Sequence, residues 1–176
     1  MIGSGPLRIA VIGDSYAAGD TLADRTDAWV NGFAAETDAT VTVLAEGGTG
    51  FTNPGFCGDN TFGSRVDRVA ETKPDLVIIE GGLNDTGASA DDEQTAVRSV
   101  LRGLGAFDVV MVGPVAVPAV TGEAKVDAWL EKAAGSANVR YVSALRWDID
   151  LGPDDKHPSA EGHAEFARRL SAAIAG

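Results

Sequence analysis

Apolar runs recur along the chain at intervals typical of alternating strands and helices. Five runs read as strands, at residues 8–12, 40–44, 76–80, 109–113 and 139–142. The inner runs are continuous and rich in Val and Ile rather than alternating with polar residues, which is typical of strands covered on both faces. The pattern therefore predicts a buried parallel sheet.

Helical periodicity and capping residues occupy the segments between these runs. The predicted helices are 28–36, 65–71, one that opens at Ser89–Asp92, 124–134 and one that begins at Pro158–Ser159. Ser89 and Asp92 have capping-box spacing, and we expect Thr121 to cap the fourth helix and Gly135 to end it. With no composition break or internal repeat, this alternation predicts one α/β domain over residues 1–176, with helices on both faces of the sheet.

Composition and charge narrow the class of protein. The 176 residues carry 14 Lys and Arg against 26 Asp and Glu, a formal charge of −12, which disfavours nucleic acids and anionic membranes as partners. We expect no membrane insertion, since the apolar runs are too short to span a bilayer, and no signal peptide is evident in the chain. Cys57 is the one cysteine, so an intrachain disulfide is excluded, and we expect this residue to be a small packed side chain. Compartment and oligomeric state are not determined by these features.

Four polar or glycine-rich segments follow the predicted strands. They are Gly13-Asp14-Ser15-Tyr16, the loop 46–52, the segment 81–85 and Asp154-Asp155-Lys156-His157-Pro158. The carboxyl ends of parallel strands gather at one edge of a sheet, where α/β proteins bind their ligands. The sequence therefore predicts a site built from all four segments.

Together these segments contain the groups that acyl transfer needs. Ser15, in a sharp turn between strand and helix, suits a nucleophile, and His157 suits the base that removes its proton. Asp154, three residues before His157, is placed to hold the imidazole, and this spacing favours it over Asp155. The Ser15 amide, a glycine amide of the second loop and the Asn84 side chain would then bind the oxyanion.

These four ordered segments resemble the blocks of the GDSL, or SGNH, hydrolases, over residues 13–157. The resemblance implies a three-layer α/β/α sandwich with a flavodoxin-like, five-stranded parallel sheet, and a Ser-His-Asp esterase mechanism without cofactor or metal. By position it makes Ser15 the nucleophile, His157 the base, Asp154 its partner, and Ser15, Gly50 and Asn84 the oxyanion donors. Gly48 is an alternative to Gly50, and Tyr16 stands where the family name has leucine.

For other residues near these segments, the sequence allows either a structural or a functional role. His163, one turn into the last helix, is expected to support the site rather than react, and Asp14 and Asp85 to bind nearby backbone amides. Some aromatic side chains near the strand ends are candidates either for a substrate pocket or for the core: Tyr16, Phe51, Phe56 and Trp147.

The expected substrate is a small-molecule or glycan ester. So short a chain leaves little room for a lid, which favours short, acetyl-type acyl groups, and the acidic charge favours a neutral ester. Alternatives are a non-catalytic glycan-binding module of the same fold, or a thioesterase or lysophospholipase of the same family. A dinucleotide-binding loop is disfavoured because Asn53 stands where its last glycine is needed, and a metal-dependent phosphatase because no carboxylate lies two residues after Asp14.

Overall fold

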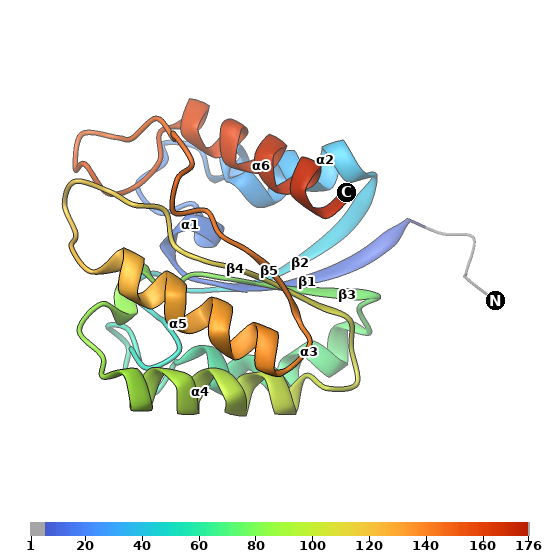
Figure 1. Cartoon of the computed structure of the whole chain (residues 1–176). Helices are drawn as coiled ribbons and strands as arrows, with labels where there is room; N and C mark the ends of the chain where they lie inside the picture. The colour runs from blue at the N-terminus through green and yellow to red at the C-terminus, as the bar shows by residue number, and fades with distance from the viewer. Residues whose placement is uncertain (1–5, 176) are drawn as a thin grey trace.

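A computed structural model describes residues 6–175, which form a parallel sheet between two helical layers (Figure 1). The strands are β1 (Leu7–Gly13), β2 (Ala39–Ala45), β3 (Leu76–Glu80), β4 (Val109–Val112) and β5 (Arg140–Val142). Their order across the sheet is β2-β1-β3-β4-β5, and every neighbouring pair is parallel. The expected five-stranded α/β fold is confirmed.

The helices divide between the two faces of the sheet. They are α1 (Ser15–Ala18), α2 (Trp29–Thr37), α3 (Val66–Thr72), α4 (Ala90–Gly103), α5 (Glu123–Ser136) and α6 (Ala160–Ala175). In Figure 1, α1, α2 and α6 lie on one side of the sheet and α3, α4 and α5 on the other. Single 3-10 turns cover Arg25–Asp27, Phe62–Arg65 and Leu83–Asp85.

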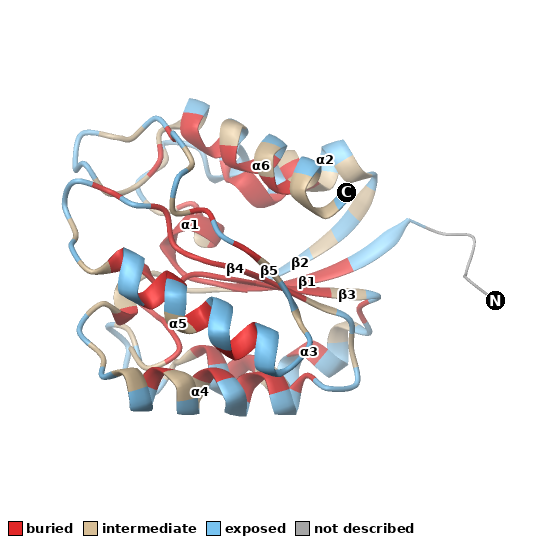
Figure 2. Cartoon of the chain, in the orientation of Figure 1, coloured by how far each residue is buried: buried red, intermediate tan, exposed pale blue. Residues whose placement is uncertain are grey.

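Each face of the sheet has its own apolar core. Ile9 and Val11 point to the face where Trp29 and Phe166 pack, while Ile12 points to the opposite face. The central strands are therefore buried on both sides (Figure 2), which explains their unbroken apolar sequences. Edge strand β2 is more exposed.

The capping predictions had mixed outcomes. Ser89 Oγ accepts a hydrogen bond from the Asp92 amide at 3.2 Å, so Ser89 caps α4 as predicted. The Asp92 carboxylate accepts the Ser89 hydroxyl at 2.7 Å rather than the Ser89 amide, so the reciprocal bond of a capping box is not formed within residues 6–175. Thr121 is not the cap of α5; that position is Gly122, with a φ of 101°. Gly135 does not end the helix, because α5 continues to Ser136.

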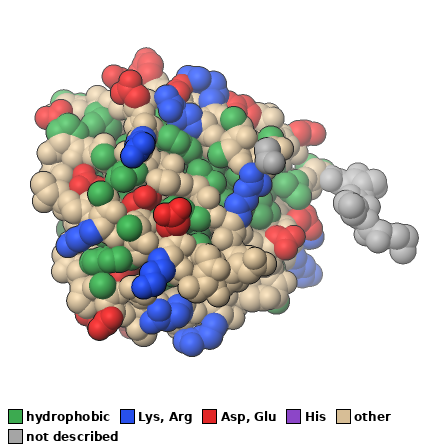
Figure 3. Space-filling model, viewed as in Figure 1, with side chains coloured by type: hydrophobic (Ala, Val, Ile, Leu, Met, Phe, Trp, Pro, Cys, Tyr) green, Lys and Arg blue, Asp and Glu red, His purple; other side chains and the backbone are tan. Residues whose placement is uncertain are grey.

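The chain reverses direction across the sheet between β1 and β3. From β1 it goes outward to β2 and then returns to the other side of β1, so the carboxyl ends of β1 and β3 form the switch point of this topology. Within residues 6–175 no helix is both long and apolar enough to cross a membrane. The face drawn in Figure 3 exposes both acidic and basic side chains.

Candidate active site

Ser15 lies at the start of the one-turn helix α1, directly after β1. The Asp14 carboxylate caps this helix by accepting a hydrogen bond of 2.9 Å from the Tyr16 amide. Gly13 is required beside them, because a Cβ there would lie 2.5 Å from the Cβ of Ala17. The turn thus places the Ser15 hydroxyl at the switch point of the sheet.

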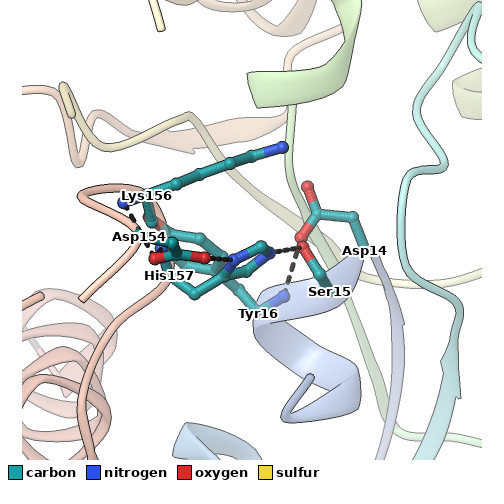
Figure 4. Close-up of polar contacts among 6 residues, drawn as sticks. All are labelled: Asp14, Ser15, Tyr16, Asp154, Lys156 and His157. Atoms are coloured by element: carbon teal, nitrogen blue, oxygen red, sulfur yellow. Dashed lines mark hydrogen bonds and ion pairs between the residues drawn. The ribbon is translucent and has the colours of Figure 1, made fainter. Parts of the chain in front are cut away.

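Ser15, His157 and Asp154 form a chain of hydrogen bonds (Figure 4). Ser15 Oγ lies 3.0 Å from His157 Nε2, and His157 Nδ1 lies 2.6 Å from Asp154 Oδ2. The other Asp154 oxygen accepts the amides of Lys156 and His157, at 3.1 and 2.9 Å. The hydrogen bond from His157 lowers the pKa of Asp154 to about 2, so this carboxylate stays ionised. Within residues 6–175, Asp155 makes no side-chain contact of this kind with His157.

Ser15, His157 and Asn84 line one cleft, which has a volume of about 620 Å³. The Asn84 amide nitrogen donates to the Thr49 carbonyl at 2.9 Å and to Asp14 Oδ2 at 3.3 Å. These contacts bring the segments after β1, β2 and β3 together. All four sequence segments therefore meet at one edge of the sheet.

The two candidate glycines occupy different positions in the loop after β2. Gly50 does not line the cleft; its amide donates to the Asn53 carbonyl at 2.9 Å, and a Cβ there would lie 2.3 Å from the Asp85 carboxylate. Gly48 lines the cleft with a φ of 76°, and its amide has no hydrogen-bond acceptor within residues 6–175.

Asp85 fixes the conformation of this loop from β3. Its carboxylate accepts the amides of Phe51, Thr52 and Asn53 at 2.9, 2.9 and 3.1 Å, and the Thr52 hydroxyl at 2.7 Å. The expectation that this aspartate binds backbone amides holds, although the amides belong to a segment more than thirty residues away in the chain.

Arg65 is a buried residue of the site region that the sequence reasoning did not single out. One of its terminal nitrogens donates to the carbonyls of Gly13 and Leu44, at 2.7 and 3.1 Å. The other donates to Thr49 Oγ1 and the Asn60 carbonyl, both at 2.7 Å. A planar guanidinium can serve all these acceptors at once, so Arg65 ties the ends of β1 and β2 to the loop.

Three buried carboxyl groups lie behind the site. Burial raises the pKa of Asp14 to about 6, and burial together with the neighbouring Asp14 raises the pKa of Glu80 well above its usual value. Glu93 on α4 contacts the Thr52 hydroxyl at 3.4 Å, and burial raises its pKa to about 8. Glu80 is the polar end of an apolar strand, which was the available sign that it is buried.

His163 is fully buried and does not contact Ser15. Its Nδ1 accepts a hydrogen bond from the Trp29 amide at 3.2 Å, and burial lowers the pKa of His163 to about 4, so the ring is neutral at physiological pH. The ring packs against Tyr16, at a centroid distance of 6.4 Å. These contacts fit the supporting role expected from the sequence.

The aromatic candidates divide between the core and the cleft. Tyr16, Phe51 and Trp147 do not line the cleft: Phe51 packs on Phe62 and Trp147 on Phe166. The exposed Phe56 and Cys57 line it instead. The prediction that Cys57 is a packed residue is wrong, because Cys57 is exposed in the loop that follows β2.

Within residues 6–175, no three metal-ligating side chains gather in a group that would hold an ion.

A parallel α/β fold with a serine, a histidine and an aspartate joined by hydrogen bonds is typical of hydrolases that use a serine nucleophile. The chain belongs to the GDSL-like lipase/acylhydrolase family, whose sequence profile matches residues 11–165.

Solved structures share this fold at low sequence identity. A psychrotrophic esterase, EstA, from Pseudoalteromonas sp. has a TM-score of 0.78 at 17% identity, over 96% of each chain. A carbohydrate acetylesterase family member from Sinorhizobium meliloti has a TM-score of 0.78 at 15% identity, over 96% of this chain and 97% of that one. A lipase/acylhydrolase from Enterococcus faecalis has a TM-score of 0.75 at 16% identity, over 94% and 96%. Among curated proteins, none matches this chain.

Proposed function

We propose that this protein hydrolyses carboxylic esters in two steps, with Ser15 as nucleophile, His157 as base and Asp154 as the partner of His157. The observation that carries the proposal is the hydrogen-bond chain from Ser15 Oγ through His157 to Asp154, at 3.0 and 2.6 Å. His157 removes the Ser15 proton as the hydroxyl attacks the ester carbonyl, and then protonates the leaving alcohol. Water, deprotonated by the same imidazole, releases the acyl group.

The oxyanion of each tetrahedral intermediate needs hydrogen-bond donors that are already in place. The Ser15 amide at the N-terminus of α1 is one of them. The Asn84 side chain is the second, and its amide nitrogen gives up its long hydrogen bond of 3.3 Å to Asp14 Oδ2 when it binds the oxyanion. The third is an amide of the loop after β2: the family resemblance indicates Gly50, while Gly48 lines the cleft and its amide has no acceptor within residues 6–175. Amide chemical shifts measured after Ser15 reacts with a phosphonate ester, a mimic of the tetrahedral intermediate, would identify the donor.

We propose short, acetyl-type esters as substrates, including acetyl groups on sugars. Polar side chains on the cleft wall support this proposal: Asp20, Arg25, Glu46, Asn53 and Asn84. Such groups suit the hydroxyls of a carbohydrate better than a long acyl chain. The carbohydrate acetylesterase family member among the similar structures is consistent with the same choice.

The test is an acyl-length series of nitrophenyl esters and a panel of acetylated sugars, assayed on the natural protein and on Ser15→Ala. We expect kcat/KM to fall with acyl length, and Ser15→Ala to lower kcat by about 10³-fold or more with an unchanged fold. Ser99→Ala, at an exposed serine of α4, is the control and should keep full activity. Equal activity of Ser15→Ala would refute the assignment, and sugar binding without turnover by the natural protein would indicate a binding module.

A further inference from the structure

In the sequence, Lys156 lies between Asp154 and His157, the two residues that form the hydrogen-bond chain with Ser15. Its backbone is engaged on both sides: its amide donates to Asp154 Oδ1 at 3.1 Å, and its carbonyl accepts the Tyr16 hydroxyl at 2.6 Å. Figure 4 shows its side chain extending past His157 toward the Asp14 side of the site. Its positive charge offsets a small part of the rise that burial causes in the pKa of Asp14, in agreement with that direction. The Lys156 side chain lines the cleft that contains Ser15.

The other charged side chains of the cleft already have partners. Arg25 forms an ion pair of 2.9 Å with Asp20, and the Glu46 carboxylate accepts a hydrogen bond from the Asn60 side chain. Lys156, in contrast, takes part in none of the ion pairs found within residues 6–175. Its ammonium is therefore the cleft charge that is free to bind a group from outside.

A role confined to balancing the charge of the site explains Lys156 less well. Asp154 is already paired with His157, at 2.6 Å. Asp14 is fully buried and accepts hydrogen bonds from the Tyr16 amide and from Asn84. Within residues 6–175, neither carboxylate forms an ion pair with the Lys156 ammonium, so both have their hydrogen-bond partners without that side chain.

We propose that the Lys156 ammonium binds a carboxylate carried by the ester substrate, and that the enzyme prefers acidic esters to neutral ones. This inference rests on the ester-hydrolase function proposed above. It differs from what the net charge of −12 suggests. Charges more than about 8 Å apart are largely screened at physiological ionic strength, so the nearest unpaired ammonium decides the preference at the site.

The test compares esters that differ in one charge. On the acyl side, mono-4-nitrophenyl glutarate is compared with 4-nitrophenyl pentanoate, which has the same leaving group. On the alcohol side, 4-acetoxyphenylacetate is compared with 4-acetoxyphenylacetamide, because the methylene group separates the charge from the leaving phenol and the amide adds no second ester. Each pair gives a ratio of kcat/KM, acidic over neutral, measured for the natural protein, Lys156→Met, Lys156→Arg and Lys125→Met. Dividing by the neutral ester cancels any effect that a variant has on Ser15 or His157.

We expect the natural protein to show a ratio above one in at least one pair, and Lys156→Met to lower that ratio about tenfold. Lys156→Arg should retain most of it, since the charge is kept. Lys125 lies over the Trp129 ring on α5, away from the cleft, so Lys125→Met should leave the ratio unchanged. Raising the salt concentration should reduce the ratio of the natural protein and not that of Lys156→Met.

The inference is overturned if neither pair shows a ratio above one, or if Lys156→Met has the same ratio as the natural protein. A failure of the proposed function would give a different result: Ser15→Ala would hydrolyse all four esters as fast as the natural protein, or neither protein would hydrolyse any of them.

Discussion

The Tyr16 hydroxyl donates a hydrogen bond of 2.6 Å to the carbonyl of Lys156, across 140 positions of the chain. The residue after the candidate nucleophile thus holds the residue before the candidate base. Tyr16 is buried and does not line the cleft, so it contacts the site through this bond and through its packing near His157, at a ring distance of 6.1 Å. We interpret Tyr16 as a positioning residue for His157 rather than as part of a substrate pocket.

Tyr16→Phe should lower kcat about tenfold and leave KM nearly unchanged, because His157 would lose a fixed position relative to Ser15. Steady-state kinetics on a nitrophenyl ester measures this split. Tyr141→Phe is the matched control, since Tyr141 makes a similar bond of 2.6 Å to Asp127 outside the cleft. It should lower the free energy of unfolding by about 1 kcal/mol without changing kcat. An equal loss of kcat in both variants would count against a positioning role for Tyr16.

Arg65→Met should lower the free energy of unfolding by about 3 kcal/mol or more, because it removes the guanidinium donors to the carbonyls of Gly13, Leu44 and Asn60. It should also speed hydrogen exchange at the amides of the loop after β2 and lower activity, as the glycine amides lose their fixed positions. Denaturant unfolding and exchange by mass spectrometry measure these changes. Arg65→Lys should not restore them, because one ammonium cannot replace the planar fork.

Arg68→Met, at an exposed position of α3, is the control for Arg65 and should change the free energy of unfolding by less than about 0.5 kcal/mol. Natural exchange rates in the loop of Arg65→Met would show that Asp85 alone holds this segment.

Gly50→Ala should destabilise the protein by about 1–3 kcal/mol, because the new Cβ would overlap the Asp85 carboxylate that holds the loop. The measurement is thermal unfolding, together with activity on a short-chain ester, which should fall as well. Gly87→Ala is the control. Its new Cβ would meet no atom within 4 Å, and Gly87 does not have the positive φ that disfavours alanine, so its stability should be close to that of the natural protein. A fully stable Gly50→Ala would mean that Asp85 can move away without loss.

Glu93→Gln should make the protein more stable than the natural form as pH rises. In the folded protein Glu93 keeps its proton up to a pKa of about 8, whereas its ordinary value is 4.5. Between these pH values the unfolded chain is ionised and the folded one is not, so the natural protein loses stability as pH rises, by up to about 1.4 kcal/mol per unit. Glutamine carries no such proton.

Denaturant titrations between pH 5 and 9 should therefore show a gap in favour of Glu93→Gln that widens to about pH 8 and then stays constant. Glu71→Gln, at an exposed position of α3, should show no widening gap. A gap of constant size at every pH would mean that Glu93 is ionised in the folded protein throughout.

The sequence by itself predicted the sheet and the candidate site residues that the structure brings together at its edge. Unbroken runs of Val and Ile predict buried parallel strands, because only strands covered on both faces bury every side chain. Ser15, Asn84 and His157 were predictable because each directly follows a strand or lies in a loop at the same sheet edge. Asp154 was predictable because it lies only three positions before His157 in one loop, a distance that the local chain alone can bridge.

Only the tertiary structure decided which side chains support these groups. Tyr16 meets Lys156, and Arg65 meets Gly13, across 140 and 52 positions. Such contacts depend on how separate segments pack, and no local pattern of the sequence encodes them. For the same reason the sequence wrongly predicted Cys57 to be packed, and it could not show that Gly48, rather than Gly50, lines the cleft. Burial and hydrogen-bond partners come from neighbours in space, and these exist only once the sheet has brought its strand ends together.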